Sequence, residues 1–200
     1  MITSKTSCFN IVKFCTFLAI MAFIPTATSA AEQSLTFDKT FELNGISFHV
    51  TCPNDSSLST LTIVPAGLTI DNSIISTEID GTVTEAEIGD LDKNGSPEIY
   101  VYITSAGSGS YGSLVAYSSN NNKSITPIYL PPLEEDETNF QGYMGHDEFT
   151  LMEGHIARRF PIYKKDDSNA NPTGGTRQLL YKLVPGEASW LLKVTRSTIL

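Results

Sequence analysis

An acidic stretch, residues 90–98, contains side chains whose types and spacing could bind a metal ion. Its oxygen-bearing side chains are Asp90, Asp92, Asn94 and Glu98. Ca²⁺ is bound by such oxygens where a chain curls around the ion at a glycine, here Gly95. The twelfth position of the stretch is Val101 instead of glutamate, which excludes a full EF-hand. A shorter calcium loop remains open, and so does a plain turn in which the acids bond their own backbone.

A second stretch, residues 105–112, consists of very small residues around one large amphipathic side chain, Tyr111. Its glycines, which allow positive φ and close approach of the backbone to another surface, are Gly107, Gly109 and Gly112. The flanking runs 99–103 and 114–117 are rich in β-branched and aromatic residues, which predicts a strand on each side. Tyr111 could fold back onto its own domain, or the loop could insert into the cleft of another protein.

The remaining candidates for chemistry are histidines and serines. The run 146–148, His-Asp-Glu, is compatible with a metal or an acid–base group, but three consecutive residues cannot all face one ion in regular structure. His49 and His155 stand alone in expected strands and are interpreted as structural. Ser110 and its neighbours precede an expected strand, whereas a nucleophile elbow precedes a helix. No residue is therefore assigned a catalytic role, and a pair of carboxylates for glycoside hydrolysis stays open because nothing in the sequence singles one out.

The elements that must position these residues are strands. Short apolar or alternating segments are separated by turns every 8–12 residues, and no amphipathic helix of useful length is present. This pattern predicts an all-β fold, an antiparallel β-sandwich of about ten short strands. Asn44-Gly45 between two alternating segments predicts a type I′ hairpin. The segment after it, 46–52, would bury every second residue. One of Arg158 and Arg159 must point inward, where it needs a carboxylate or carbonyl partner.

The first thirty residues have the pattern of a cleaved secretory signal peptide. Lys5 and Lys13 precede a short apolar run, 14–24, and small residues follow at 28–30. The apolar run is too short for a membrane anchor, so we expect an exported protein without one. Residues 31–44 would then form an N-terminal lead-in and the first strand. Residues 45–200 would form the main domain.

The net charge and the cysteine content restrict the kinds of binding partner and the disulfides that the protein can form. The 200-residue chain has a formal net charge of −9, which removal of the signal and its two lysines would change to −11. Such acidity argues against nucleic acid and anionic membranes, and it suits a basic partner. Cys8 and Cys15 lie in the signal, so Cys52 cannot form an internal disulfide. It is expected either to be buried as a small apolar residue or to pair between chains.

Five runs of the sequence together resemble the family of periplasmic inhibitors of invertebrate-type (i-type) lysozyme. The runs are 89–99, 104–117, 143–149, 159–163 and 169–178. The similarity extends over roughly 45–200, and it is most specific in Ser-Ala-Gly-Ser-Gly-Ser-Tyr-Gly and Pro-Thr-Gly-Gly-Thr-Arg-Gln. It implies a β-sandwich, a homodimer in the periplasm of a Gram-negative bacterium, and inhibition of an i-type lysozyme without catalysis.

The resemblance also implies which residues contact the lysozyme. The inhibitory Ser-Gly-Ser-Tyr element of the family falls on 108–111, so Ser108 and Tyr111 would reach the active site. The residues that would shape the loop around them are Gly107, Gly109, Ser110 and Gly112. The resemblance implies no cofactor. The acidic loop, residues 90–98, leaves a bound calcium ion as an open alternative. The alternative function is a calcium- or carbohydrate-binding exported β-sandwich module that uses residues 90–98.

Overall fold

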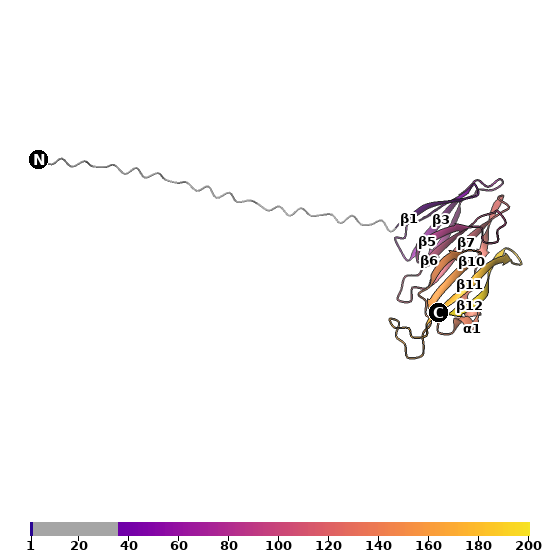
Figure 1. Cartoon of the computed structure of the whole chain (residues 1–200). Helices are drawn as coiled ribbons and strands as arrows, with labels where there is room; N and C mark the ends of the chain where they lie inside the picture. Colours follow the sequence, from indigo (N-terminus) through magenta and orange to yellow (C-terminus); the bar gives the residue numbers. More distant parts are fainter. Residues whose placement is uncertain (2–35) are drawn as a thin grey trace. The chain divides into compact units, whose positions relative to one another are not determined.

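The computed structural model describes Met1 and residues 36–200. Apart from Met1, the signal peptide predicted for 1–30 and the first residues of the predicted lead-in, 31–35, lie outside the described residues. The helices and strands belong to one unit of the chain, Ser34–Leu200. Strands dominate this unit (Figure 1). The all-β prediction is confirmed, with twelve strands in the described residues where about ten were expected.

A four-stranded antiparallel sheet comes first along the chain. Its strands are β1 (Phe37–Leu43), β2 (Ile46–Cys52), β3 (Leu58–Ala66) and β4 (Ile75–Asp80), in that spatial order. Asn44 and Gly45 turn between β1 and β2 with φ values of 54° and 79°, as a type I′ hairpin requires. Every second residue of β2 is buried, so the predicted hairpin and its inward face are confirmed. Cys52, at the end of this face, is fully buried.

The other eight strands form a second sheet. They are β5 (Thr82–Gly89), β6 (Glu98–Thr104), β7 (Gly112–Asn120), β8 (Ser124–Tyr129), β9 (Glu148–Met152), β10 (His155–Pro161), β11 (Thr176–Pro185) and β12 (Trp190–Ile199). Their order is β5-β6-β7-β8-β12-β11-β10-β9, and η1 (Leu133–Glu135) and α1 (Glu137–Phe140) follow β8 along the chain. All neighbours are antiparallel except β8 and β12. The expected antiparallel pattern is interrupted there. The chain passes through η1, α1 and β9 to β11 between β8 and β12, so no hairpin turn requires these two strands to be antiparallel.

Strand β6 lies between the two cores of the protein. On one face, Ile99, Val101 and Ile103 join the cluster that packs the four-stranded sheet against the second sheet. On the other face, Tyr100 and Tyr102 join a cluster with apolar residues of β7, β8, β10, β11 and β12. A strand buried on both faces reads as a continuous apolar run in the sequence. This explains why 99–103 shows no alternation of apolar and polar residues.

The second sheet curls so that its two end strands approach each other. The backbone N–H of Leu151 in β9 donates to Oε2 of Glu87 in β5 at 2.7 Å. The rings of Tyr102 in β6 and Phe149 in β9 stack with centroids 5.8 Å apart. These contacts bring the chain around 143–149, which precedes and enters β9, close to the β6 end of the sheet.

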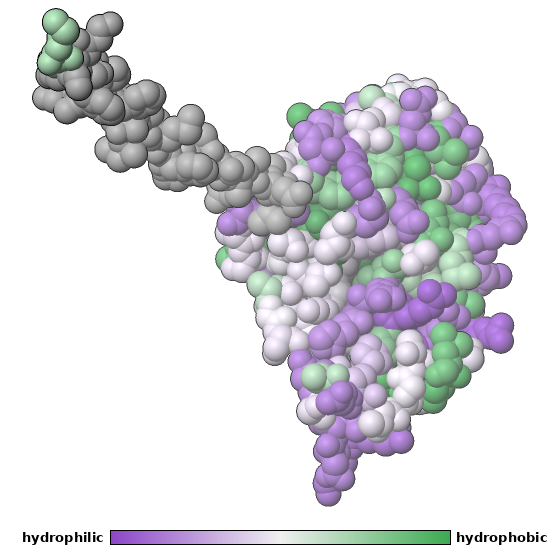
Figure 2. Space-filling view, turned by 60° about the vertical axis from the view of Figure 1, so that its left-hand side comes forward, coloured by the Kyte–Doolittle hydropathy of each residue, from purple (hydrophilic) through white to green (hydrophobic). Residues whose placement is uncertain are grey.

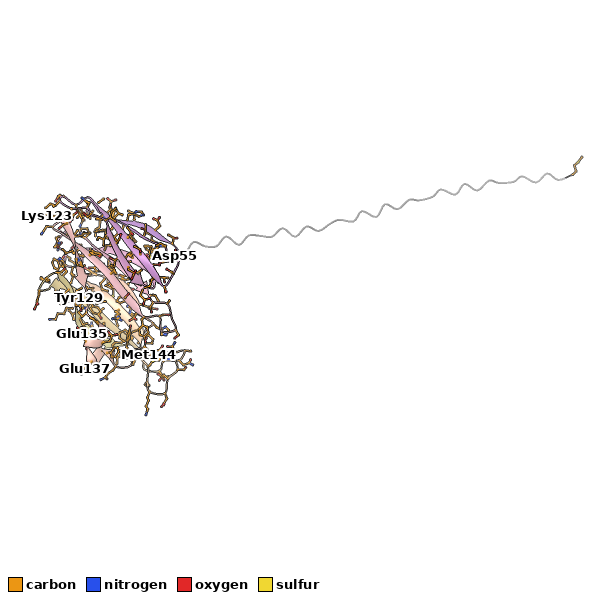
Figure 3. The ribbon with its side chains drawn as sticks, turned by 180° about the vertical axis from the view of Figure 1, so that it is seen from behind. Asp55, Lys123, Tyr129, Glu135, Glu137 and Met144 are labelled. Carbon is orange, nitrogen blue, oxygen red and sulfur yellow. The ribbon has the colours of Figure 1, made fainter. Side chains whose placement is uncertain are left out.

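Strand β6 therefore carries one candidate loop at each of its ends. The acidic loop precedes it and the 105–112 loop follows it, so about 20 Å of strand separates them. In Figure 3, Lys123 and Met144 lie toward opposite ends of the domain. Lys123 follows Asn122, whose side-chain amide donates to the carbonyl of Gly95 in the acidic loop at 3.4 Å. Met144 belongs to the segment that contacts the 105–112 loop.

Some large apolar side chains reach the surface. Ile70 and Ile74 are 74% and 64% exposed. On the face shown in Figure 2, apolar patches alternate with polar ones. Among residues 36–200, no helix combines the length and the apolar character that crossing a membrane would require.

Candidate functional site

The 105–112 loop connects β6 to β7 and is closed at its base. The N–H of Ser105 donates to the carbonyl of Tyr111 at 2.9 Å, and the N–H of Tyr111 donates to Oγ of Ser105 at 3.1 Å. Within the loop, the N–H of Ser110 donates to the carbonyl of Gly107 at 3.1 Å. These bonds make the loop a defined turn on top of the β6–β7 hairpin.

A second segment, residues 143–147, braces the loop from one side. The N–H of His146 donates to the carbonyl of Gly109 at 2.7 Å and to that of Ser110 at 3.2 Å. Gly145 approaches so closely that a Cβ on it would lie 2.1 Å from the Gly109 carbonyl oxygen. Ser110 and His146 both have positive φ, 44° and 59°. Such backbone strain in residues other than glycine persists only where the surroundings enforce it, so the loop and its brace hold each other in place.

A third segment holds the tip of the loop. The side-chain amide of Asn169 donates to the carbonyl of Ser108 at 2.7 Å, and its Oδ1 lies 3.2 Å from Nε2 of His146. Asn169 is held in turn by Tyr163, whose hydroxyl donates to the Asn169 carbonyl at 3.0 Å. Asp167 organises this segment by accepting bonds from the backbone N–H groups of Lys164 and Thr173, both at 2.7 Å. These bonds hold the pKa of Asp167 below its usual value.

A buried ion pair fixes the point where the loop enters β7. Nε of Arg158 lies 2.7 Å from Oδ1 of Asp147, and their side chains are only 6% and 0% exposed. The other oxygen of Asp147 accepts bonds from the N–H of Gly112 at 2.7 Å and from the Tyr143 hydroxyl at 2.6 Å. The guanidinium also donates to the Tyr143 hydroxyl at 2.9 Å. The prediction that one of the two consecutive arginines points inward to a carboxylate is confirmed for Arg158.

The ionisation states of this cluster follow from its burial and its charges. Burial alone would lower the pKa of Arg158, but the adjacent Asp147 carboxylate outweighs it and raises that pKa overall. Burial, followed by the hydrogen bond to Asp147, raises the pKa of Tyr143. Arg158 therefore stays a cation and Tyr143 stays a neutral hydroxyl that can donate. The cluster is a structural support under the loop.

The loop presents the hydroxyl-bearing side chains of Ser108 and Tyr111 to solvent. Tyr111 is 49% exposed, and its ring meets the ring of Tyr143 edge-on with centroids 5.7 Å apart. Its ring also lies over Gly109, where a Cβ would come within 2.4 Å of it. Ser108 is exposed. Within residues 36–200, neither the Tyr111 hydroxyl nor the Ser108 hydroxyl has a hydrogen-bond partner. Tyr111 thus rests part of its ring against Tyr143, Gly109 and Gly145, and leaves about half of the side chain and the hydroxyl available.

A hollow of about 350 Å³ lies beside Tyr111. It is lined in part by Leu114, Pro132, Glu134 and Arg158. The arrangement offers an aromatic face, two hydroxyl donors and backbone groups held in one geometry. The histidine that contacts the loop, His146, directs Nε2 to Asn169 and not to a loop hydroxyl. That histidine therefore makes no contact that would activate a loop serine as a nucleophile.

The structure also locates the other candidates from the sequence. Asp90, Asp92 and Glu98 come together at the start of β6, whereas the Asn94 side chain bonds within the loop. Nε2 of His49 in β2 lies 2.8 Å from Oδ1 of Asp38 in β1, so this histidine belongs to the four-stranded sheet and not to the 105–112 loop. In the run 146–148, the Asp147 side chain binds the buried Arg158, whereas the His146 side chain contacts Asn169. These two side chains therefore do not face a shared metal or acid–base site.

Sequence reasoning missed the segments that support the loop. The supporting residues lie far from the loop in sequence. Asp147 follows its partner Gly112 by 35 positions, and Asn169 follows its partner Ser108 by 61. One signal was present: Gly145 precedes His-Asp-Glu, and a glycine there allows the close approach. Comparison of the chain with family models, curated proteins and solved structures finds no match.

Proposed function

We propose that this protein inhibits an i-type lysozyme by inserting the 105–112 loop into the active-site cleft and so blocks peptidoglycan hydrolysis. The observation that carries the proposal is Tyr111, half exposed with its hydroxyl unpaired within residues 36–200, on a loop held by two other segments. A loop fixed before binding loses little conformational freedom on binding, which favours tight inhibition. The resemblance of the surrounding sequence to lysozyme inhibitors supplies the target.

The chemistry of the target suits the two exposed side chains. Lysozymes cleave glycosidic bonds with carboxylic acid groups in a deep cleft. The hydroxyls of Tyr111 and Ser108 would donate to such a carboxylate, and a hydrogen bond to a charged group contributes on the order of 1.5–3 kcal/mol. The exposed side of the Tyr111 ring would bury apolar area while only two side-chain torsions become fixed. A narrow loop reaches a carboxylate at the bottom of a cleft where a flat surface cannot.

The charge of the chain supports the same partner. Its formal net charge is −9, and the hollow beside Tyr111 includes Glu134 in its lining. The negative net charge would steer a basic lysozyme toward the protein and would raise the association rate more than the final affinity. The charge suits a basic lysozyme. The signal-peptide pattern and the resemblance to the inhibitor family are the grounds on which we propose a periplasmic homodimer.

Substitution of the two exposed side chains tests the proposal. Tyr111→Ala removes the ring and the hydroxyl, and we expect an increase of about thirtyfold or more in the inhibition constant, as for a central interface residue. Tyr111→Phe and Ser108→Ala remove one hydroxyl each and should raise the constant roughly 10- to 100-fold. The matched control is Tyr129→Ala on β8, because Tyr129 is 54% exposed and lies outside the loop.

The measurement is residual peptidoglycan hydrolysis by an i-type lysozyme as a function of inhibitor concentration. Circular dichroism and thermal unfolding would establish that each variant is folded. A folded Tyr111→Ala variant that inhibits as well as the unsubstituted protein would rule out insertion of the loop. Equal weakening by Tyr129→Ala would show that the effect is not specific to the loop.

A further inference from the structure

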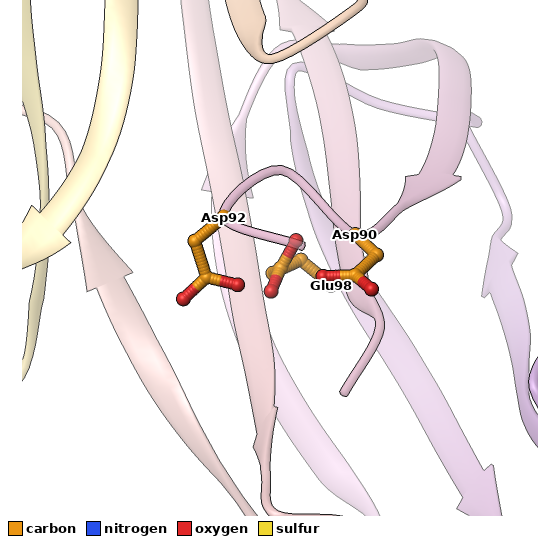
Figure 4. A group of neighbouring side chains, drawn as sticks. All are labelled: Asp90, Asp92 and Glu98. Atoms are coloured by element: carbon orange, nitrogen blue, oxygen red, sulfur yellow. The ribbon is translucent and has the colours of Figure 1, made fainter. Parts of the chain in front are cut away.

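Three carboxyl groups converge at the end of β6 that lies away from the 105–112 loop. They belong to Asp90, Asp92 and Glu98, and one oxygen from each lies within 4.8 Å of the others. Figure 4 shows the three groups on the same side of the turn, with Glu98 between the two aspartates. Like charges at this separation repel each other, so the arrangement requires a physical explanation.

Glu98 makes the arrangement unusual because it is fully buried. Its exposure is 0%, and its Oε1 atom has no hydrogen-bond partner. Its other oxygen accepts bonds from the N–H of Leu91 at 2.8 Å and from the Tyr100 hydroxyl at 3.4 Å. A buried polar atom without a partner calls for an explanation, and an ion or water bound to it is one.

The loop holds both aspartates in position with backbone bonds. Asp90 accepts bonds from the N–H groups of Asn94 at 2.9 Å and Gly95 at 2.8 Å. Asp92 accepts a bond from the N–H of Asn94 at 3.2 Å and one from its side-chain amide at 2.8 Å. Each carboxylate oxygen has two lone pairs, so these bonds orient the acids without using their whole capacity to bind a cation.

No basic side chain neutralises the cluster within residues 36–200. Lys93 is adjacent in sequence, but its ammonium group lies 3.2 Å from Glu153 on the neighbouring hairpin. Asn94 directs its Oδ1 to the N–H of Ser96 at 2.7 Å and so braces the turn. Three acids, one of them buried with an unpaired oxygen, therefore share a space without a compensating positive charge.

We propose that Asp90, Asp92 and Glu98 bind one Ca²⁺ ion at the start of β6. Hard carboxylate oxygens are the ligands that Ca²⁺ prefers, and Ca–O distances of about 2.3–2.6 Å place opposite ligands about 4.6–5.2 Å apart. Mg²⁺ requires about 2.0–2.1 Å and near-ideal octahedral geometry, which three irregularly placed side chains satisfy poorly. The ion would bond to the free oxygen of Glu98, and carbonyls and water would complete its coordination.

Thermal unfolding with added CaCl₂ tests the site in the purified protein. A ligand at a hundred times its dissociation constant raises the unfolding midpoint of a protein of this size by about 5–10 °C. We expect such a rise with millimolar CaCl₂ after treatment with a chelator, a smaller rise with MgCl₂, and a stoichiometry of one ion by calorimetry. No rise with calcium, or an equal rise with magnesium, would overturn the proposal.

Two variants and a matched control locate the effect. Glu98→Gln keeps the size of the buried side chain and removes its charge, so this variant should fold without calcium and show no calcium-dependent rise. Asp92→Asn should reduce the rise and provides a second reading if Glu98→Gln does not fold. Glu187→Gln removes an exposed charge from the turn between β11 and β12, outside the cluster, and should keep the full rise. A full rise in Glu98→Gln or Asp92→Asn would place the ion elsewhere.

The calcium proposal and the lysozyme proposal can be tested independently, because the acidic loop and the 105–112 loop lie at opposite ends of β6. We expect Glu98→Gln to retain inhibition of lysozyme, and Tyr111→Ala to retain the calcium-dependent rise. Loss of inhibition in a folded Glu98→Gln variant would contradict this separation.

Discussion

Replacement of Gly145 by alanine tests whether the support of the 105–112 loop matters for function. The added Cβ would lie 2.1 Å from the carbonyl oxygen of Gly109, against 3.4–4 Å for an ordinary contact. The obstacle is backbone, so the loop and the 143–147 segment must separate by more than 1 Å. That separation stretches the bond from the His146 N–H to the same carbonyl, now 2.7 Å long.

The size of the effect follows from what the loop would lose. An alanine at φ +88° costs about 1–2 kcal/mol of stability, which leaves the domain folded. If the displaced loop loses one hydrogen bond to a charged group on the target, the loss of about 1.5–3 kcal/mol raises the inhibition constant roughly 10- to 100-fold. Stability should thus fall modestly while inhibition falls steeply.

The control is Gly45→Ala, in the hairpin turn of the other sheet. Gly45 has a similar φ of +79°, but a Cβ there would meet nothing within 4 Å. Both variants are destabilised by placing alanine at a positive φ, whereas only Gly145→Ala displaces the 105–112 loop. Urea unfolding measures the stability, and residual lysozyme activity measures the inhibition. Unchanged inhibition by a folded Gly145→Ala variant, or equal loss in Gly45→Ala, would refute the claim that the brace presets the loop.

Two further predictions concern the groups that support the loop. Asp147→Asn leaves the buried Arg158 cation without its partner and should lower the free energy of unfolding by about 3–5 kcal/mol in urea titrations; a change below about 1 kcal/mol would contradict the role of the pair. In the folded protein the pKa of Asp167 lies below its ordinary value of 3.8, because its carboxylate accepts bonds from the N–H groups of Lys164 and Thr173. These bonds should therefore persist above pH 3.8 and be lost as the pH falls through the folded pKa. An NMR titration of those amide signals checks this, and a transition at pH 3.8 or above would count against it.

Local signals in the sequence were sufficient to predict several parts of the fold. Asn44-Gly45 predicts its hairpin because a type I′ turn needs two residues that tolerate positive φ. The apolar run 99–103 and the small residues after it predict a strand that ends in a loop. The consecutive arginines predict one inward side chain, because successive residues of a strand face opposite sides. Each of these inferences depends only on residues close in sequence.

The support of the candidate site could not be predicted in this way. Asp147 and Asn169 reach the loop because β9 curls toward β5 and because β10 pairs with β11, which are long-range arrangements. No local pattern distinguishes an aspartate that will accept three bonds around a buried arginine from one in a solvated loop. The parallel contact of β8 with β12 is hidden for the same reason, since it joins segments about sixty residues apart.

Titration of an i-type lysozyme with the purified protein tests the central claim most directly. Residual hydrolysis of peptidoglycan should fall linearly to near zero and level off at a fixed molar ratio, with one inhibitor chain per lysozyme. The same titration with Tyr111→Ala should require a large excess. Full lysozyme activity in the presence of excess folded protein would contradict the proposed function, and an end-point unaffected by Tyr111→Ala would contradict the role of the loop.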